Sequence, residues 1–165
     1  MWITGSIGDS FIGLQILKNK ITIKDKKIKN YFVNKYYFPK PCMIGPKISK
    51  YISSAKDISD GFIGDLKKML NYNYGASLNI DKLPITNYMD KILKSKLINK
   101  KFLLNSGDDY ELIIISPKKN RDKISHIAKS NNVKISLVGK TTKKIEIVDD
   151  SNKTLNIPKE FDHFL

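Results

Sequence analysis

The sequence predicts a single domain of the α/β or α+β class, in which a mixed β-sheet is backed by helices. Strand-like and helix-like segments alternate along the 165 residues, and this alternation is typical of that class. The hydrophobic content of 41% is that of an ordinary globular domain. No apolar run approaches the roughly 20 residues that a membrane-spanning helix needs.

The first half of the chain is predicted to contain short strands that lead into helices. Asp9 or Ser10 can cap the first helix, and the Pro39-Lys40-Pro41 stretch ends the second. Apolar residues at helical spacing indicate the rest of each helix. The expected strands are 2–4 and 56–58, and the expected helices are 9–17, 26–37, 43–53 and 62–70.

The second half shows the same alternation. Its helices are predicted from amphipathic periodicity, and its strands from alternating or β-branched runs. The expected strands are 76–80, 110–116, 134–138 and 143–148, and the expected helices are 88–98 and 121–130. The order of these elements does not settle which strands pair.

The amino-acid composition limits the classes of function that we expect for this chain. The net charge is +14, but only Arg121 among the 30 basic residues is an arginine. Arginine is the usual reader of phosphates and base edges, and the lysines are spread along the chain, so we expect no nucleic-acid partner. A single cysteine, Cys42, excludes an internal disulfide and fits a reducing, cytoplasmic setting. The N-terminus does not resemble a signal peptide, and no membrane association is expected.

Two acidic, glycine-punctuated segments are the most informative feature of this basic chain. The first, Asp57-Ile58-Ser59-Asp60-Gly61, follows a predicted strand and leads into a helix. A divalent cation between its carboxylates and a phosphate at the helix N-terminus would suit phosphoryl transfer. The alternative is structural, with Asp60 or Ser59 as a helix cap and Asp57 on the surface. Asp65, in the first turns of that helix, is favourable through the helix dipole alone.

The second segment, Ser106-Gly107-Asp108-Asp109-Tyr110-Glu111, lies at a strand entrance. Taken alone, it also fits an ordinary turn. A glycine loop at 5–10 joins the first strand to the first helix, but it lacks the Gly-Lys-Ser/Thr end of a P-loop. A tight connection is therefore favoured over a phosphate cradle.

Taken in order, these motifs resemble the C-terminal half of the thiamine-monophosphate kinase family, in the aminoimidazole ribonucleotide synthetase superfamily. The resemblance runs from end to end and rests on the D-x-S-D-G segment, the G-D-D-Y-E-L segment and the D-H-F ending. The matching stretches are 3–10, 39–41, 57–61, 81–84, 107–112, 138–139 and 161–164.

The resemblance implies the fold of that C-terminal domain and an ATP-dependent transfer of phosphate to thiamine monophosphate, with several Mg²⁺ ions. It also implies that the family enzyme forms a homodimer through its N-terminal domain, which residues 1–165 do not include. By the same resemblance, the metal ligands are Asp57 and Asp60, the ATP contact is Ser59, and the contacts to thiamine monophosphate are Asp108 and Phe161.

The departures from the family keep alternatives open. The family enzyme is about twice as long, and its other half carries most of the metal-binding aspartates. Phe38 and Cys42 replace family arginines, and Ser106 replaces a glycine. This chain is therefore interpreted as a half that is inactive alone and works with a separately encoded N-terminal half. The alternatives are a non-catalytic remnant and half of a related ATP-dependent enzyme of the superfamily. A face that meets the other half would be an apolar patch, expected at the first strands.

Overall fold

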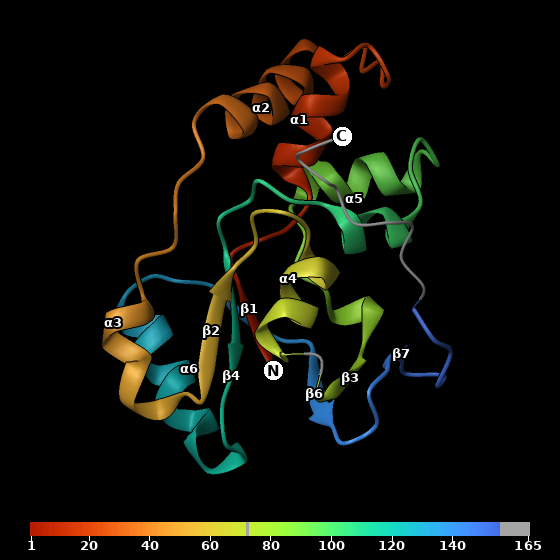
Figure 1. Cartoon of the computed structure of the whole chain (residues 1–165). Coiled ribbons are helices and arrows are strands. Elements are labelled where there is room, and N and C mark those ends of the chain that lie inside the picture. The colour runs from red at the N-terminus through yellow and green to blue at the C-terminus, as the bar shows by residue number, and fades with distance from the viewer. Residues whose placement is uncertain (72, 156–165) are drawn as a thin grey trace.

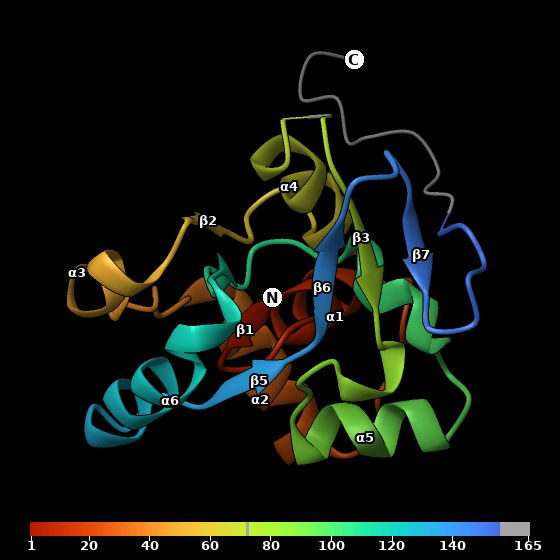
Figure 2. The same ribbon diagram turned by 90° about the horizontal axis from the view of Figure 1, so that it is seen from below.

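The structure, a computed structural model, describes residues 1–71 and 73–155, which form two β-sheets with helices around them (Figures 1 and 2). The larger sheet is antiparallel throughout, and the smaller sheet pairs β3 antiparallel with β6 and parallel with β7. The order in the larger sheet is β2 (Ser54–Asp57), β4 (Leu112–Ile115), β1 (Trp2–Thr4) and β5 (Ile135–Leu137). The order in the smaller sheet is β6 (Gly139–Thr142), β3 (Gly75–Leu78) and β7 (Ile147–Asp149).

Val138 is the junction between the two sheets. Its N–H donates to the Met1 carbonyl at 3.0 Å, and its own carbonyl accepts from the Asn79 N–H at 2.8 Å. The chain therefore leaves the larger sheet after β5 and enters the smaller one as β6. The α+β class is confirmed, but the β-structure is divided into two sheets. The strand expected at 143–148 is wrong in its bounds, because pairing with β3 selects 139–142 and 147–149 instead.

Several helices have the predicted bounds within a residue. The segments at 43–53 and 88–98 are shorter than predicted and continue into or are followed by short 3₁₀ turns. The helices are α1 (Asp9–Leu17), α2 (Lys26–Tyr37), α3 (Gly45–Ile48), α4 (Phe62–Met69), α5 (Asn87–Lys94) and α6 (Arg121–Ser130). The 3₁₀ turns are Ser49–Tyr51, Ile80–Lys82, Lys100–Asn105 and Lys118–Asn120.

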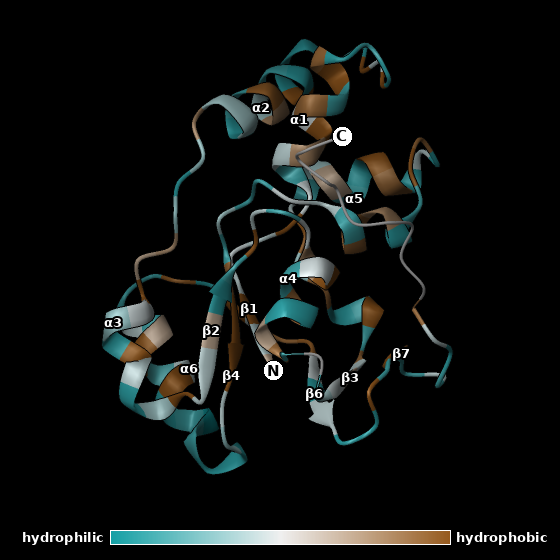
Figure 3. Cartoon of the chain, viewed as in Figure 1, coloured by the Kyte–Doolittle hydropathy of each residue, from teal (hydrophilic) through white to brown (hydrophobic). Residues whose placement is uncertain are grey.

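The larger sheet is covered on both faces. Trp2 and Ile114 pack with Ile44 and Ile48 of the α3 region and with Ala128 of α6. The other face belongs to the main core, which is built around residues such as Ile3, Ile58, Phe62, Leu66 and Ile113. Figure 3 shows the hydrophobic character of the central strand β4. Burial of this apolar surface from both sides is the main stabilisation of the domain.

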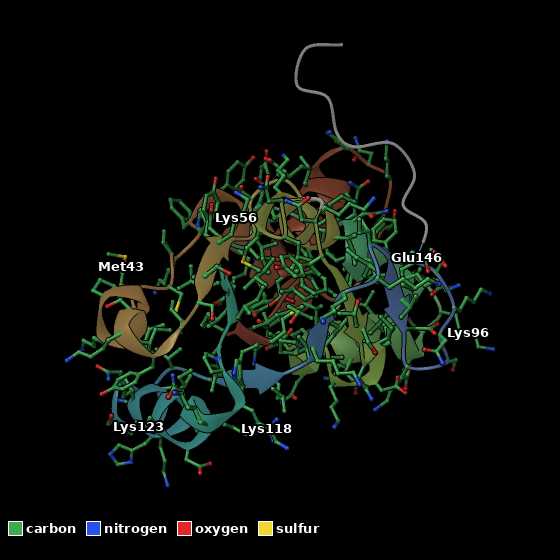
Figure 4. The ribbon with its side chains drawn as sticks, turned by 60° about the horizontal axis from the view of Figure 1, so that its bottom comes forward. Met43, Lys56, Lys96, Lys118, Lys123 and Glu146 are labelled. Carbon is green, nitrogen blue, oxygen red and sulfur yellow. The ribbon has the colours of Figure 1, made fainter. Side chains whose placement is uncertain are left out.

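The apolar patch expected at the first strands is not there. All of β1 is buried, because β1 lies between β4 and β5. Among the described residues, the most exposed large apolar side chains lie on the connection between α2 and α3, where Phe38 and Met43 are 71% and 77% exposed (Figure 4). No helix in the described part of the chain is long and apolar enough to cross a membrane.

Candidate functional site

The fold places the two acidic segments side by side. Four backbone hydrogen bonds join them: Ile58 N–H to Glu111 O at 2.8 Å, Tyr110 N–H to Ile58 O at 3.0 Å, Asp108 N–H to Ser59 O at 2.9 Å and Phe62 N–H to Ser106 O at 3.2 Å. They continue the β2–β4 ladder beyond Asp57, which pairs with Leu112. Asp57, Ser59, Asp60 and Asp108 therefore belong to one edge of the larger sheet, although about fifty residues separate the two segments.

Gly107 makes this close approach possible. A Cβ atom at this position would lie 2.2 Å from the Ser59 carbonyl oxygen, which is a backbone atom that cannot move aside cheaply. The neighbouring Asp108 and Tyr110 have positive φ angles of 60° and 53°. Left-handed backbone is uncommon for residues other than glycine and costs conformational energy, especially at a bulky residue. The second segment is thus held in an unusual conformation against the first.

Asp65 shapes the loop between β2 and α4. Its Oδ2 atom accepts the backbone N–H groups of Ser59, Asp60 and Gly61 at 2.9, 3.0 and 3.2 Å. Its Oδ1 atom lies 3.4 Å from Lys56 Nζ, and the side chain is fully buried. The sequence analysis gave Asp65 no role beyond the helix dipole. The sequence did contain a signal for this role. Gly61 has no side chain that could cap the helix, and an acidic residue, Asp65, follows it four positions later.

The alternative that Asp60 or Ser59 serves as a helix cap is wrong. The N-cap of α4 is Gly61, which has no side chain, and neither Ser59 nor Asp60 occupies that position. Asp60 instead accepts from Lys68 Nζ at 2.8 Å, and Asp57 lies 3.7 Å from Lys56 Nζ. The carboxylates of Asp57 and Asp60 are therefore not used to cap this helix.

The donor chemistry fits part of a Mg²⁺ site. The side chains of Asp57 and Asp60 keep 48% and 34% of their surface exposed, whereas the Asp65 carboxylate is buried and held by backbone donors. Within the described residues, no group of three or more acidic, histidine or cysteine side chains could hold a metal by itself. Mg²⁺ is often bound by one or two carboxylates together with substrate phosphates. Asp57 and Asp60 could supply such a partial set.

Asp108 lies where the sequence placed it, half-buried beside the Ser59 carbonyl. Phe161, the other predicted substrate contact, lies outside the described residues, as does the D-H-F ending. Ser106, a departure from the family pattern, is buried without strain. Its φ of −75° suits any residue, and its hydroxyl donates to the Leu103 carbonyl at 2.8 Å.

The glycine loop at residues 5–10 is held by carboxylates from the second segment. Asp109 accepts the N–H groups of Gly8 and Ser10 at 2.6 and 3.2 Å. The N-cap of α1 is Gly8, without a side-chain cap from its own neighbourhood. The expectation that Asp9 or Ser10 caps this helix is wrong, because Gly8 is the N-cap and Asp109, just before the neighbouring strand β4, supplies the capping carboxylate.

Three carboxyl groups meet around this loop, and all have raised pKa values. Burial, with a smaller contribution from the neighbouring charges of Asp9 and Glu111, raises the pKa of Asp109 to about 7 despite its two backbone hydrogen bonds. Burial also raises the pKa of Asp9 and Glu111. Tyr31 donates to Asp9 at 2.7 Å, and the pKa of Tyr31 is raised, first by burial and then by this bond. Sequence reasoning did not single out this cluster, because Asp9 comes from α1, Tyr31 from α2, and Asp109 and Glu111 from the distant second segment.

Comparison with known proteins gives a consistent result. The family model of AIR synthase related protein, C-terminal domain, matches residues 3–150. Thiamine-monophosphate kinase from Buchnera aphidicola subsp. Acyrthosiphon pisum is 35% identical over 170 residues, which cover 99% of this chain and 52% of that protein. The chain thus spans about half the length of the curated relatives it matches.

Solved structures share the fold. Thiamine-monophosphate kinase from Stenotrophomonas maltophilia K279a aligns with a TM-score of 0.80 at 23% identity, over 93% of this chain and 50% of that one. A structure of AaThiL complexed with AMPPCP and TMP aligns with a TM-score of 0.79 at 22% identity, over 99% of this chain and 50% of that one. The resemblance inferred from the motifs is confirmed, and the chain belongs to the AIR synthase related family, as its C-terminal domain.

Proposed function

We propose that this chain is the substrate- and metal-binding half of a thiamine-phosphate kinase, which converts ATP and thiamine monophosphate to ADP and thiamine diphosphate. The observation that carries the proposal is the backbone pairing of the two acidic segments, which groups Asp57, Ser59, Asp60 and Asp108 at one sheet edge. The relatives' names and the AMPPCP and TMP of the AaThiL complex support the same chemistry.

In this proposal, Asp57 and Asp60 hold Mg²⁺, Ser59 contacts ATP, and Asp108 and Phe161 contact thiamine monophosphate. Bound Mg²⁺ would neutralise the negative charge that two phosphate-bearing reactants bring together. The protein's task is then to position the two reactants in line, which requires carboxylates and backbone donors rather than a nucleophile. The thiamine ring is cationic and aromatic, so Phe161 could stack on it and Asp108 could balance its charge.

The proposed enzyme needs more residues than this chain offers. The described carboxylates at the sheet edge supply only part of a metal site, and the chain spans about half of its relatives. We therefore propose that an N-terminal half supplies the remaining ligands and the dimer interface, and that residues 1–165 alone have little or no kinase activity. The single cysteine, which is free, suits a cytoplasmic setting.

The decisive experiment is calorimetric titration of thiamine monophosphate into the full 165-residue chain with Mg²⁺ and a non-hydrolysable ATP analogue. We expect binding that Asp108→Ala and Phe161→Ala abolish and that the exposed control Asp150→Asn leaves intact. Asp57→Asn and Asp60→Asn should remove the Mg²⁺ dependence of nucleotide binding. An absence of binding under every metal condition would favour the second candidate, a folded but non-catalytic remnant. That candidate is motivated by the incomplete metal site.

A further inference from the structure

A cavity lies at the opposite end of the larger sheet from the acidic segments. The strand β4 begins beside Glu111 and ends at Ile115, and four strand residues extend about 13 Å. Beyond its end is a cavity of about 310 Å³, lined in part by Met1, Trp2 and Leu137. It is therefore separate from the proposed kinase site, and the inference below does not depend on that function.

Positive charge surrounds this cavity. Lys118, Arg121 and Lys140 line it, and its lining includes no aspartate or glutamate. Arg121 is the only arginine in the sequence. Within the described part of the chain, none of these three side chains takes part in an ion pair, although six lysine–carboxylate pairs occur elsewhere. Figure 4 shows Lys118 at the edge of the molecule beside the ribbon of α6.

The helix that begins at the cavity adds to this charge. The first residue of α6 is Arg121, and no side chain caps the helix. The N-cap residue, Asn120, donates its amide to the Tyr51 carbonyl at 2.8 Å instead of accepting from the helix. A helix N-terminus carries a partial positive charge, which adds to the repulsion among the three cations of the cavity lining and is only partly offset by Asp122 in the first turn of α6. A bound anion would relieve this repulsion.

The amino group of Met1, which lies nearby, is affected by the same positive charge. The Met1 amino group donates to the Gly139 carbonyl at 2.8 Å. Its pKa is lowered to about 6, first by burial and then by the charge of Arg121. The charge of Arg121 thus reaches into the cavity and is not cancelled there by a carboxylate.

We propose that this cavity is a binding site for a small phosphate-bearing molecule, with the phosphate between Arg121, Lys118 and Lys140 and the organic part against the apolar wall that includes Trp2. A guanidinium group and a helix N-terminus are both suited to phosphate oxygens. The volume lies at the small end of the range for ligand pockets. A polynucleotide is not favoured, because it requires a long basic groove rather than one cavity of about 310 Å³.

The test uses the fluorescence of Trp2, which is the single tryptophan of the chain. The full 165-residue protein is titrated with inorganic phosphate and then with ribose 5-phosphate, with chloride keeping the ionic strength constant. We expect a saturable change in fluorescence, with ribose 5-phosphate binding more tightly than phosphate. Arg121→Gln and Lys140→Gln should weaken binding at least about tenfold. Lys129→Gln removes the same charge from the other end of α6 and should weaken binding less than about twofold.

Arg121→Lys provides a second variant if Arg121→Gln fails to fold. This variant keeps the positive charge but loses the planar guanidinium group with its several N–H donors. We expect its affinity for ribose 5-phosphate to lie between that of the parent and that of Lys140→Gln. The proposal is overturned by an absence of saturable binding, or by equal losses in Lys129→Gln and Arg121→Gln, which would indicate diffuse charge. It is also overturned if a short RNA competes with ribose 5-phosphate and its affinity does not change in Arg121→Gln.

Discussion

The Asp109 carboxylate accepts a 2.6 Å hydrogen bond from the backbone N–H of Gly8, which lies 101 residues earlier in the chain. This bond, together with the one from Ser10, attaches the start of α1 to the second acidic segment. The glycine loop and the paired acidic segments thereby become one connected unit.

Substitution of Asp109 should therefore destabilise the fold. Asp109→Ala leaves two buried N–H groups without an acceptor, and we expect the free energy of unfolding to fall by about 2–4 kcal/mol. Urea denaturation measures this loss. The exposed Asp150→Asn should stay within about 0.5 kcal/mol of the parent. An Asp109→Ala protein as stable as the parent would show that solvent replaces the carboxylate.

The raised pKa of Asp109 predicts a loss of stability on going from pH 5 to pH 8. Its folded pKa of about 7 lies above the usual value of 3.8 for an aspartate, so the folded state binds the proton more tightly. The unfolded state is already ionised across most of this range, and stability should fall by roughly 2 kcal/mol as the folded carboxyl loses its proton near pH 7.

Asp9 and Glu111, whose pKa values are also raised, act in the same direction. The Met1 amine acts in the opposite direction, since its pKa falls from 8.0 to about 6 and it favours the folded state as the pH rises between these values. Comparison with Asp109→Asn at each pH isolates the Asp109 contribution. Identical pH slopes for the two proteins would contradict the assignment.

Asp65 should control the order of the first acidic segment without contacting a ligand. Asp65→Asn weakens three backbone hydrogen bonds and leaves Lys56 without its buried partner. We expect a loss of about 2–4 kcal/mol in unfolding free energy. Hydrogen exchange at the amides of residues 59–61 should become faster. Unchanged protection of these amides would show that the backbone pairing alone holds the loop. Asp122→Asn, in the first turn of α6, is the matched control.

Gly107→Ala should separate the two acidic segments. The added methyl group would lie 2.2 Å from the Ser59 carbonyl oxygen, and we expect a loss of more than about 2 kcal/mol together with lost substrate binding. Gly64→Ala is the control, because nothing lies within 4 Å of a Cβ in that helical position. It should stabilise the protein by up to about 1 kcal/mol. Thermal unfolding of both variants compares the two effects directly, and similar melting temperatures would argue against the close approach.

The local pattern of the sequence determined most of the helices and the identity of the acidic segments. Residues 26–37 and 121–130 form helices with the predicted bounds, because apolar spacing and helix-ending residues act within a few positions of each other. The ordered motifs likewise identified the family before any contact was known. The proposed roles of Asp57, Ser59, Asp60, Asp108 and Phe161 rest on that identification and await the titrations.

Only the tertiary structure decided which distant parts of the chain contact one another. The division into two sheets at Val138, the capping of α1 by Asp109 and the cationic cavity around Arg121 each join residues far apart in sequence. Strand pairing and buried hydrogen bonds depend on which segments come together in the folded chain. Side-chain periodicity does not identify those segments. The buried Asp65 shows the same limit at short range, since its side chain holds a loop that also pairs with the distant second segment.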